Sequence, residues 1–194
     1  MEKVKTQALV KVGFLSATAF ILMYLEFQVP LFPGFLKLDL SDIPALVASF
    51  AIGPLYGVMV ELIKNILHAT ITQSGGIGEI ANFTVGSIFV ATAGIIYHFN
   101  KTRKTALIAM AVATLVMSVS ASLLNYYVFL PLYQKVMGFP MDAIIGMGKM
   151  ANKRIVDLKT LIAYGIFPFN LLKGFVISAI TFLIYKKISP LFKA

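Results

Sequence analysis

An asparagine and a lysine lie close together in an apolar segment near the C-terminus of the 194-residue chain. Asn170 and Lys173 belong to the sequence Asn-Leu-Leu-Lys-Gly, within an apolar run from Ile166 to Tyr185. Residues three positions apart share one face of a helix. A lysine inside an apolar segment of bilayer length is costly and normally has a functional role or a partner. We therefore expect both side chains to offer hydrogen bonds to a common target.

A second polar set follows the helical repeat earlier in the chain. Glu61, Lys64, Asn65 and His68 occupy positions i, i+3, i+4 and i+7, which form one stripe on a helix. Glu61 and Lys64 can pair inside the protein, which lowers the free-energy cost of burying each charge. A structural ion pair is the preferred interpretation. The alternative is a membrane-embedded enzyme that uses Glu61, His68 or Glu79 as acid or base.

The common catalytic motifs are missing from the sequence. It contains no Gly-x-x-x-x-Gly-Lys-Ser/Thr loop, no His-Glu-x-x-His pair and no Gly-x-Ser-x-Gly elbow. With two histidines and no cysteine, a zinc site would depend on carboxylates. We expect no metal, no cofactor and no enzymatic activity. Uptake of a ligand against a gradient would then need a partner that hydrolyses ATP.

The composition predicts an all-α integral membrane protein that forms a single membrane-embedded domain over residues 1–194. The chain is 59% hydrophobic and only 13% charged, whereas about a quarter of a typical soluble domain is charged. The net charge of +9 is explained by basic loops that fix membrane topology. We therefore expect the lipid bilayer, and no nucleic acid, as a partner.

The apolar segments predict a six-transmembrane-helix bundle, because about 20 residues cross a bilayer. The expected helices cover residues 7–25, 42–52, 54–72, 79–98, 105–132 and 168–187. In the connector 26–41, Pro30, Pro33 and Gly34 prevent a continuous helix. Its Phe and Leu content predicts that this connector folds back onto the protein. The mixed connector 133–167 is expected to be partly helical and to lie at the surface.

Clusters of basic residues predict the orientation in the membrane. They occur at both ends of the chain and after the fourth predicted helix, and the positive-inside rule places all three in the cytoplasm. Both termini are therefore predicted to be cytoplasmic. The residues concerned are Lys3, Lys5, Lys11, Lys101, Arg103, Lys104, Lys186, Lys187 and Lys193. The basic residues of the 133–167 connector are more dilute and are mixed with acids.

This orientation gathers polar residues of separate helices near the outer membrane surface. Asn170 and Lys173 open the last predicted helix, and Glu79 and Asn82 open the fourth. Asn125 lies about 30 Å along the fifth predicted helix, at about 1.5 Å per residue, and so near its outer end. Apolar walls with a few polar groups are typical of small-molecule sites. The sequence therefore predicts an outward-facing ligand pocket.

Five stretches of the sequence match a known family. They are Phe35-Leu-Lys-Leu-Asp-Leu-Ser-Asp-Ile-Pro-Ala-Leu-Val47, Gly78-Glu-Ile-Ala-Asn-Phe83, the pair Leu124-Asn-Tyr-Tyr and Leu130-Pro-Leu-Tyr133, and Phe169-Asn-Leu-Leu-Lys-Gly174. The chain resembles the riboflavin-specific substrate-binding subunits, or S components, of energy-coupling factor (ECF) vitamin transporters. The resemblance covers nearly the whole length.

The resemblance implies a bundle of six helices with an external loop that covers a riboflavin pocket. It implies polar contacts to the flavin from Asn125, Asn170 and Lys173. Leu36 and Leu38 would belong to the covering loop. Further ligand contacts are expected from Glu79 and Asn82. Riboflavin would be the transported ligand, so no cofactor is implied.

The resemblance also implies partners in a bacterial or archaeal cell membrane. The small-residue face of the first helix, Gly13-x-x-x-Ala17, would pack against a membrane scaffold subunit that two ATPases drive. Family members often have two alanines here, and the glycine is a conservative departure in size. S components for thiamine, biotin or folate share the bundle and remain alternatives. A purely structural membrane subunit is a further alternative.

Overall fold

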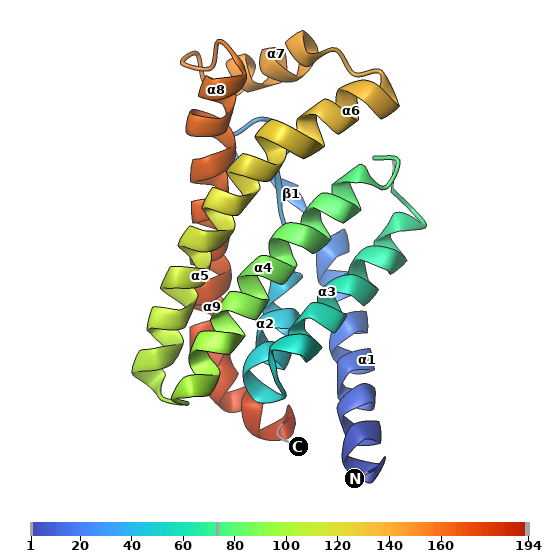
Figure 1. Cartoon of the computed structure of the whole chain (residues 1–194), viewed down its shortest axis with the longest axis vertical. Helices are drawn as coiled ribbons and strands as arrows, with labels where there is room; N and C mark the ends of the chain where they lie inside the picture. Colours follow the sequence, from blue (N-terminus) through green and yellow to red (C-terminus); the bar gives the residue numbers. More distant parts are fainter. Residues whose placement is uncertain (1, 73, 193–194) are drawn as a thin grey trace.

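The computed structural model describes residues 2–72 and 74–192, with side chains described within 6–72 and 74–185. The lysines at positions 3, 5, 186, 187 and 193, used above to predict orientation, lie outside the described side chains. The chain folds into an elongated bundle of helices with one small hairpin (Figure 1). The first helix, α1 (Glu2–Tyr24), begins at the same end of the bundle at which the last helix, α9 (Phe167–Phe192), finishes.

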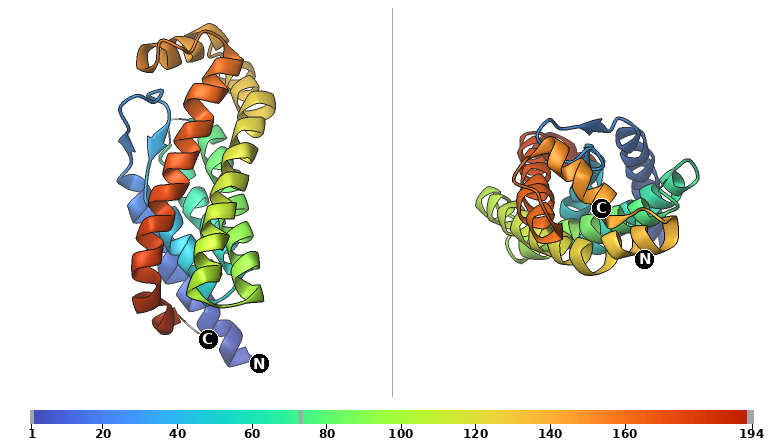
Figure 2. Two further views of the ribbon diagram at one scale, coloured as in Figure 1. Left: turned by 90° about the vertical axis from the view of Figure 1, so that its left-hand side faces the viewer. Right: turned by 90° about the horizontal axis from the view of Figure 1, so that it is seen from above.

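The connector after α1 folds back onto the bundle, as predicted. It forms a two-stranded antiparallel hairpin, β1 (Phe27–Gln28) and β2 (Lys37–Leu38), in which Phe27 pairs with Leu38. The Phe32 ring in the hairpin loop meets the Phe169 ring edge-on at a centroid distance of 5.5 Å. The hairpin therefore packs against the beginning of α9, at the end of the bundle away from the termini (Figure 2).

Two shorter helices follow the hairpin. Helix α2 (Asp42–Ala51) lies in the middle of the bundle, and every residue from Asp42 to Phe50 is buried. Helix α3 (Pro54–Ala69) begins with a proline, which needs no hydrogen-bonding partner for its backbone nitrogen in the first turn. A Cβ on Gly57 would lie 2.8 Å from the Ala45 carbonyl oxygen, so only glycine allows α2 and α3 to approach this closely.

Long helices complete the bundle. They are α4 (Ile77–Phe99) and a continuous helix built from α5 (Arg103–Leu124), the π-helical turn η1 (Asn125–Phe129) and α6 (Leu130–Met137). The last helix starts earlier than predicted, with α8 (Leu158–Leu161) and the π-helical turn η2 (Ile162–Ile166) before α9. The Asp157 side chain starts it by accepting a 2.7 Å hydrogen bond from the Thr160 backbone. That hydrogen bond lowers the pKa of the exposed Asp157 carboxyl.

Within the described residues, four helices are long and apolar enough to cross a membrane. They cover Thr6–Tyr24, Ile77–Phe99, Arg103–Met137 and Leu158–Tyr185. Helices form at all six predicted segments, but α2 has 10 residues and α3 has 16. Both are shorter than the about 20 residues that span a bilayer. The protein is therefore a multi-pass helical membrane protein, while the count of six spans stays a prediction.

The two ends of the bundle differ in their packing. At the end that holds the start of α1, the rings of Phe50, Tyr97 and Tyr185 pack together. The ring centroids of Phe50 and Tyr97 are 4.5 Å apart. At the other end, helix α7 (Met141–Ala151) crosses above the bundle on a smaller apolar cluster that includes Ile144 and Leu161. The end that holds the start of α1 is closed by aromatic packing, and the opposite end is covered by the hairpin and α7.

Candidate ligand-binding site

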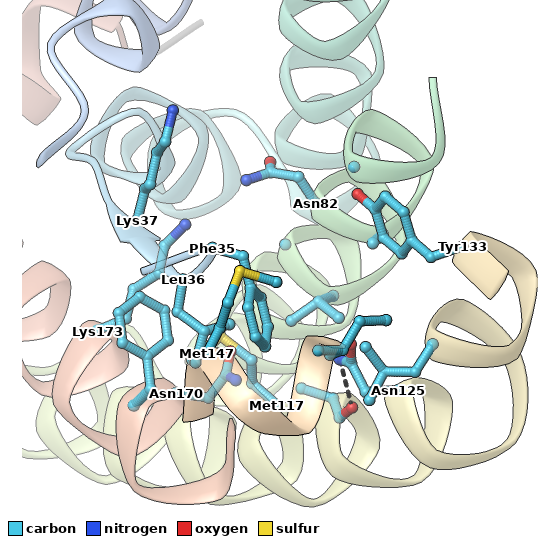
Figure 3. A pocket seen from close by; sticks show the side chains of 18 of the residues that line it. Phe35, Leu36, Lys37, Asn82, Met117, Asn125, Tyr133, Met147, Asn170 and Lys173 are labelled. Atoms are coloured by element: carbon cyan, nitrogen blue, oxygen red, sulfur yellow. Dashed lines mark hydrogen bonds between the residues drawn. The ribbon is translucent and has the colours of Figure 1, made fainter. Parts of the chain in front are cut away.

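A cavity of about 380 Å³ lies at the end of the bundle that the hairpin and α7 cover. Its walls come from the hairpin, α2, α4, α5 with η1 and α6, the segment around α7, and α9 (Figure 3). Cavities of about 300–1,000 Å³ are typical of small-molecule sites. Segments far apart in the sequence therefore enclose a space large enough for a small organic molecule.

The walls of the cavity are mostly apolar. Phe35, Met117, Met147 and Phe169 supply large, polarisable side chains, and Leu36 adds an aliphatic one. Aromatic faces and thioethers both make favourable contacts with a flat ring system. The cavity is therefore suited to the burial of an aromatic ligand.

Two asparagines on facing helices point into the cavity with part of their hydrogen-bonding capacity unused. The Nδ2 of Asn125 donates to the Ala121 carbonyl at 2.8 Å, and that of Asn170 donates to the Ile166 carbonyl at 2.8 Å. An amide side chain has two N–H donors and a carbonyl acceptor. Each asparagine is thus anchored to its own helix by one N–H and keeps the other donor and the acceptor for a ligand.

Both asparagines adjoin π-helical turns, which the sequence analysis did not anticipate. Asn125 begins η1, and η2 ends four residues before Asn170. The two turns contact each other across the bundle. π-helical turns are rare and often occur at functional sites. Here both π-helical turns lie in the helices that carry the two cavity asparagines.

Lys173 lies on the cavity wall but already has two carboxylate partners. Its Nζ donates to Asp39 Oδ2 at 3.0 Å and lies 3.2 Å from Asp42 Oδ2. Its side chain is 10% exposed. The sequence predicted an ammonium group directed at the ligand, and the structure shows that most of its charge is neutralised by protein groups. A donor is still available, because an ammonium group has three N–H bonds.

Behind this wall the predicted ion pair of Glu61 and Lys64 is confirmed, with Lys64 Nζ 2.9 Å from Glu61 Oε2. Lys64 also donates to Ser41 Oγ at 2.7 Å and pairs with Asp42. The charge cluster, defined here as Asp39, Asp42, Glu61, Lys64 and Lys173, is buried as a whole. Its ion pairs link the end of the hairpin to α2, α3 and α9, so the charge cluster holds these elements together beside the cavity.

Of the seven predicted ligand-binding residues, the structure brings five to the cavity wall. These are Leu36, Asn82, Asn125, Asn170 and Lys173. Their roles in binding stay a prediction.

Glu79 and Leu38 are not on the cavity wall. Glu79 instead accepts from Ser74 Oγ at 2.6 Å and lies 2.8 Å from His68 Nδ1. Leu38 is buried in the hairpin, where it pairs with Phe27. Their contacts brace the α3–α4 turn and the hairpin.

Several wall residues were missed from the sequence because they lie in the 133–167 connector. Tyr133, Phe139, Ile144 and Met147 line the cavity from α6 and the segment around α7. The connector was expected at the surface, yet it forms part of the cavity's cover. The apolar residues Met141, Ile144 and Ile145 follow the i, i+3, i+4 helical repeat, which could have signalled a buried face.

Gly13 and Ala17, the pair of small residues predicted on α1, face outward. Gly13 and Ala17 are exposed, and a Cβ added to Gly13 would meet no atom within 4 Å. Ser16, between them in sequence, is buried against the bundle. The Gly13–Ala17 face is therefore open to a neighbouring molecule in the membrane.

The family model described as ECF transporter, substrate-specific component, matches residues 7–185. The chain belongs to this family. Its fold agrees: a structure described as "Structure and mechanism of the S component of a bacterial ECF transporter" superposes with a TM-score of 0.77 at 34% sequence identity. The match covers 98% of this chain and 99% of that chain.

Relatives of this substrate-specific component include riboflavin transporters. It is 37% identical over 189 residues to the riboflavin transporter RibU of Staphylococcus aureus (strain TCH60), covering 97% of this chain and 94% of that protein. It is 36% identical over 189 residues to the riboflavin transporter FmnP of Bacillus subtilis (strain 168), covering 96% and 94%. The similarity is thus spread over the whole substrate-specific component.

Proposed function

We propose that this protein is the riboflavin-binding subunit of a vitamin uptake system in the cell membrane. The observation that carries the proposal is the cavity, whose aromatic and thioether walls suit the flavin rings. The unused N–H and carbonyl oxygen of Asn125 and of Asn170 suit the imide edge of those rings. The names of the two riboflavin transporters that it resembles support the same ligand. No catalytic step, cofactor or metal is part of this function.

Titration of the purified, ligand-free protein with riboflavin tests the proposal. Binding should quench flavin fluorescence at submicromolar ligand, because the rings would stack in an apolar, aromatic environment. Thiamine, biotin and folate should not displace riboflavin, which separates this ligand from those of sister subunits. Failure to bind riboflavin at micromolar concentrations would contradict the proposal.

Replacement of Asn170 by Leu is expected to weaken riboflavin binding by about 1–3 kcal/mol, since a buried polar group of the ligand would lose its partner. Leu has a similar size and leaves the apolar wall intact. Asn125→Leu should have a similar effect through the facing helix. Fluorescence titration measures both, with Asn100→Leu as a control at an exposed position outside the cavity. Unchanged affinity in both variants would place the flavin's polar contacts elsewhere.

The same proposal includes a membrane orientation. The basic residues at both ends of the sequence favour cytoplasmic termini. The hairpin and α7 would then cover the cavity on the external side. In this arrangement α2 and α3 complete a six-helix bundle of the S-component type. Cysteine labelling at an exposed residue of α7, such as Met150, should react with a membrane-impermeant reagent added outside intact cells.

For energy, the protein would join a membrane scaffold subunit and two ATPases, as the ECF family implies. The exposed Gly13–Ala17 face of α1 is the proposed docking surface, because small residues allow close helix approach. Glycine at position 13 leaves open space where a large side chain would project into the partner.

Replacement of Gly13 by Phe is therefore expected to abolish co-purification with the scaffold subunit and riboflavin uptake by cells. Riboflavin binding by the isolated subunit should stay within about twofold of wild type, because no described residue of α1 lines the cavity. Ala111→Phe is a matched control, since Ala111 is exposed on α5, across the bundle from α1. Normal uptake in the Gly13 variant would move the docking surface off α1.

A further inference from the structure

Asp39 occupies a distinctive position just after the hairpin. It follows β2 directly, is 4% exposed, and is not among the residues that line the cavity. Its Oδ1 accepts from the Ser41 backbone nitrogen at 2.8 Å and from the Ser41 hydroxyl. Its Oδ2 accepts from Lys173 Nζ at 3.0 Å. Both carboxylate oxygens are therefore engaged, and neither is left for a ligand.

The bond between Asp39 and Lys173 joins segments that are 134 positions apart. On one side is the hairpin, whose residues Phe35, Leu36 and Lys37 form one wall of the cavity. On the other side is α9, which contributes Asn170 and Lys173 to the facing wall. The ion pair thus fixes the distance between two walls that would both touch a bound ligand.

Asp39 also restricts the orientation of the Lys173 ammonium group, because the two form an ion pair. The ammonium group has three N–H donors, and Asp39 and Asp42 lie within 3.0 and 3.2 Å of it. These two acceptors, one after the hairpin and one at the start of α2, engage two of the donors and leave the third for the cavity, whose wall includes Lys173. A charged donor with both other bonds satisfied has little freedom to turn away, which lowers the entropic cost of holding it against a ligand.

We propose that Asp39 is a positioning residue for ligand binding that acts through Lys173, by fixing the direction of its free N–H and the spacing of hairpin and α9. The proposal rests on the riboflavin-binding function proposed above. It deepens that function by assigning a role to a residue that does not touch the ligand.

A double-mutant cycle on riboflavin affinity tests this assignment. Asp39→Asn keeps the size of the side chain and removes its charge, and is expected to weaken binding about tenfold or more. Lys173→Met should weaken binding at least as much. In the Asp39→Asn/Lys173→Met protein, the loss should equal that of Lys173→Met alone or be smaller, because Asp39 no longer has a lysine to orient and its unpaired buried charge is gone.

The other ion pair of the hairpin provides the matched control. Lys37 pairs with Glu26 across the two strands, but both side chains are substantially exposed, at 45% and 31%. Exposed pairs contribute little, so Glu26→Gln should change riboflavin affinity by less than about twofold. Thermal unfolding of every variant, recorded without ligand, separates changes in the fold from changes in binding.

Three outcomes overturn the assignment. Riboflavin affinity of a folded Asp39→Asn protein that equals wild type would show that Asp39 has no part in binding. Losses that multiply in the double variant would show that Asp39 acts independently of Lys173. No binding by the wild-type protein would overturn the proposed function and this assignment together, whereas the first two outcomes leave the proposed function standing. If Asp39→Asn alone does not fold, the riboflavin affinities of Lys173→Met and the double variant are compared. The double variant contains no unpaired Asp39 charge, and a further loss of affinity in it would show that Asp39 acts independently of Lys173.

Discussion

Replacement of Lys64 by Met is expected to lower the free energy of unfolding by about 3–5 kcal/mol, because it removes one partner from a buried ion-pair cluster. Lys64 is fully buried, and its ammonium group contacts Asp42, Glu61 and Ser41. Met has a similar length and flexibility, so it fills the same space without the charge. The effect should therefore come from the carboxylates that are left without a partner and not from a cavity.

The charge balance of the cluster makes this loss large. Three carboxylates, on Asp39, Asp42 and Glu61, face two ammonium groups, on Lys64 and Lys173. Lys64→Met would leave one ammonium group, on Lys173, beside these three carboxyl groups. Charges far from water are expensive unless they are paired. The Glu61 carboxyl group packs tightly against Gly86 of α4, where an added Cβ would lie only 2.8 Å from its carboxyl carbon. The cluster therefore has little room to rearrange after the substitution.

Thermal unfolding in detergent measures the effect, and two further variants check its cause. Glu61→Gln removes one buried carboxyl group with little change of shape, so it should be tolerated and should recover part of the stability of Lys64→Met. Lys153→Met, at an exposed position, should change stability by no more than about 0.5 kcal/mol. Equal stability of wild type and Lys64→Met would mean that the cluster does not hold the bundle together. The enzyme alternative, in which Glu61 is the acid or base, instead predicts turnover of a lipid-soluble substrate that Glu61→Gln abolishes.

Replacement of Ala121 by Phe is expected to abolish riboflavin binding, with a loss of about a hundredfold or more, which corresponds to about 2.8 kcal/mol. Ala121 is 1% exposed and lines the cavity between Met117 and Asn125 on the same helix. A phenyl ring at this position would occupy part of the 380 Å³ that the ligand needs. Because the ring enters existing space, the fold should tolerate it better than overpacking of a filled core, which costs about 1–3 kcal/mol.

Fluorescence titration with riboflavin measures this loss, and thermal unfolding shows whether the fold survives. Val119→Phe is the matched control, since Val119 lies two residues away on the same helix but is 50% exposed on its outer face. Its riboflavin affinity should equal that of wild type. A folded Ala121→Phe protein that binds riboflavin normally would show that the flavin does not use this cavity.

The helical segments could be predicted from the sequence because their signals are local. The apolar run at 79–98 is the helix Ile77–Phe99, and the connector 26–41, predicted to break the helix and fold back, does both, although its hairpin was not predicted. The pocket polar groups Asn82, Asn125 and Asn170 could also be predicted to gather at one depth. A polar side chain in an apolar helix is visible in the sequence, and the rise per residue gives its depth.

What the sequence alone determined was thus the membrane class, the helices and the polar residues that they bring to one end. Only the tertiary structure showed that Lys173 pairs with Asp39 and Asp42, and that α7 covers the cavity with Ile144 and Met147. It also showed the π-helical turns beside Asn125 and Asn170. The physical reason is range: hydropathy and turn signals act over a few residues, whereas ion pairs and cavity walls join residues more than a hundred positions apart, and their geometry is set by how the helices pack.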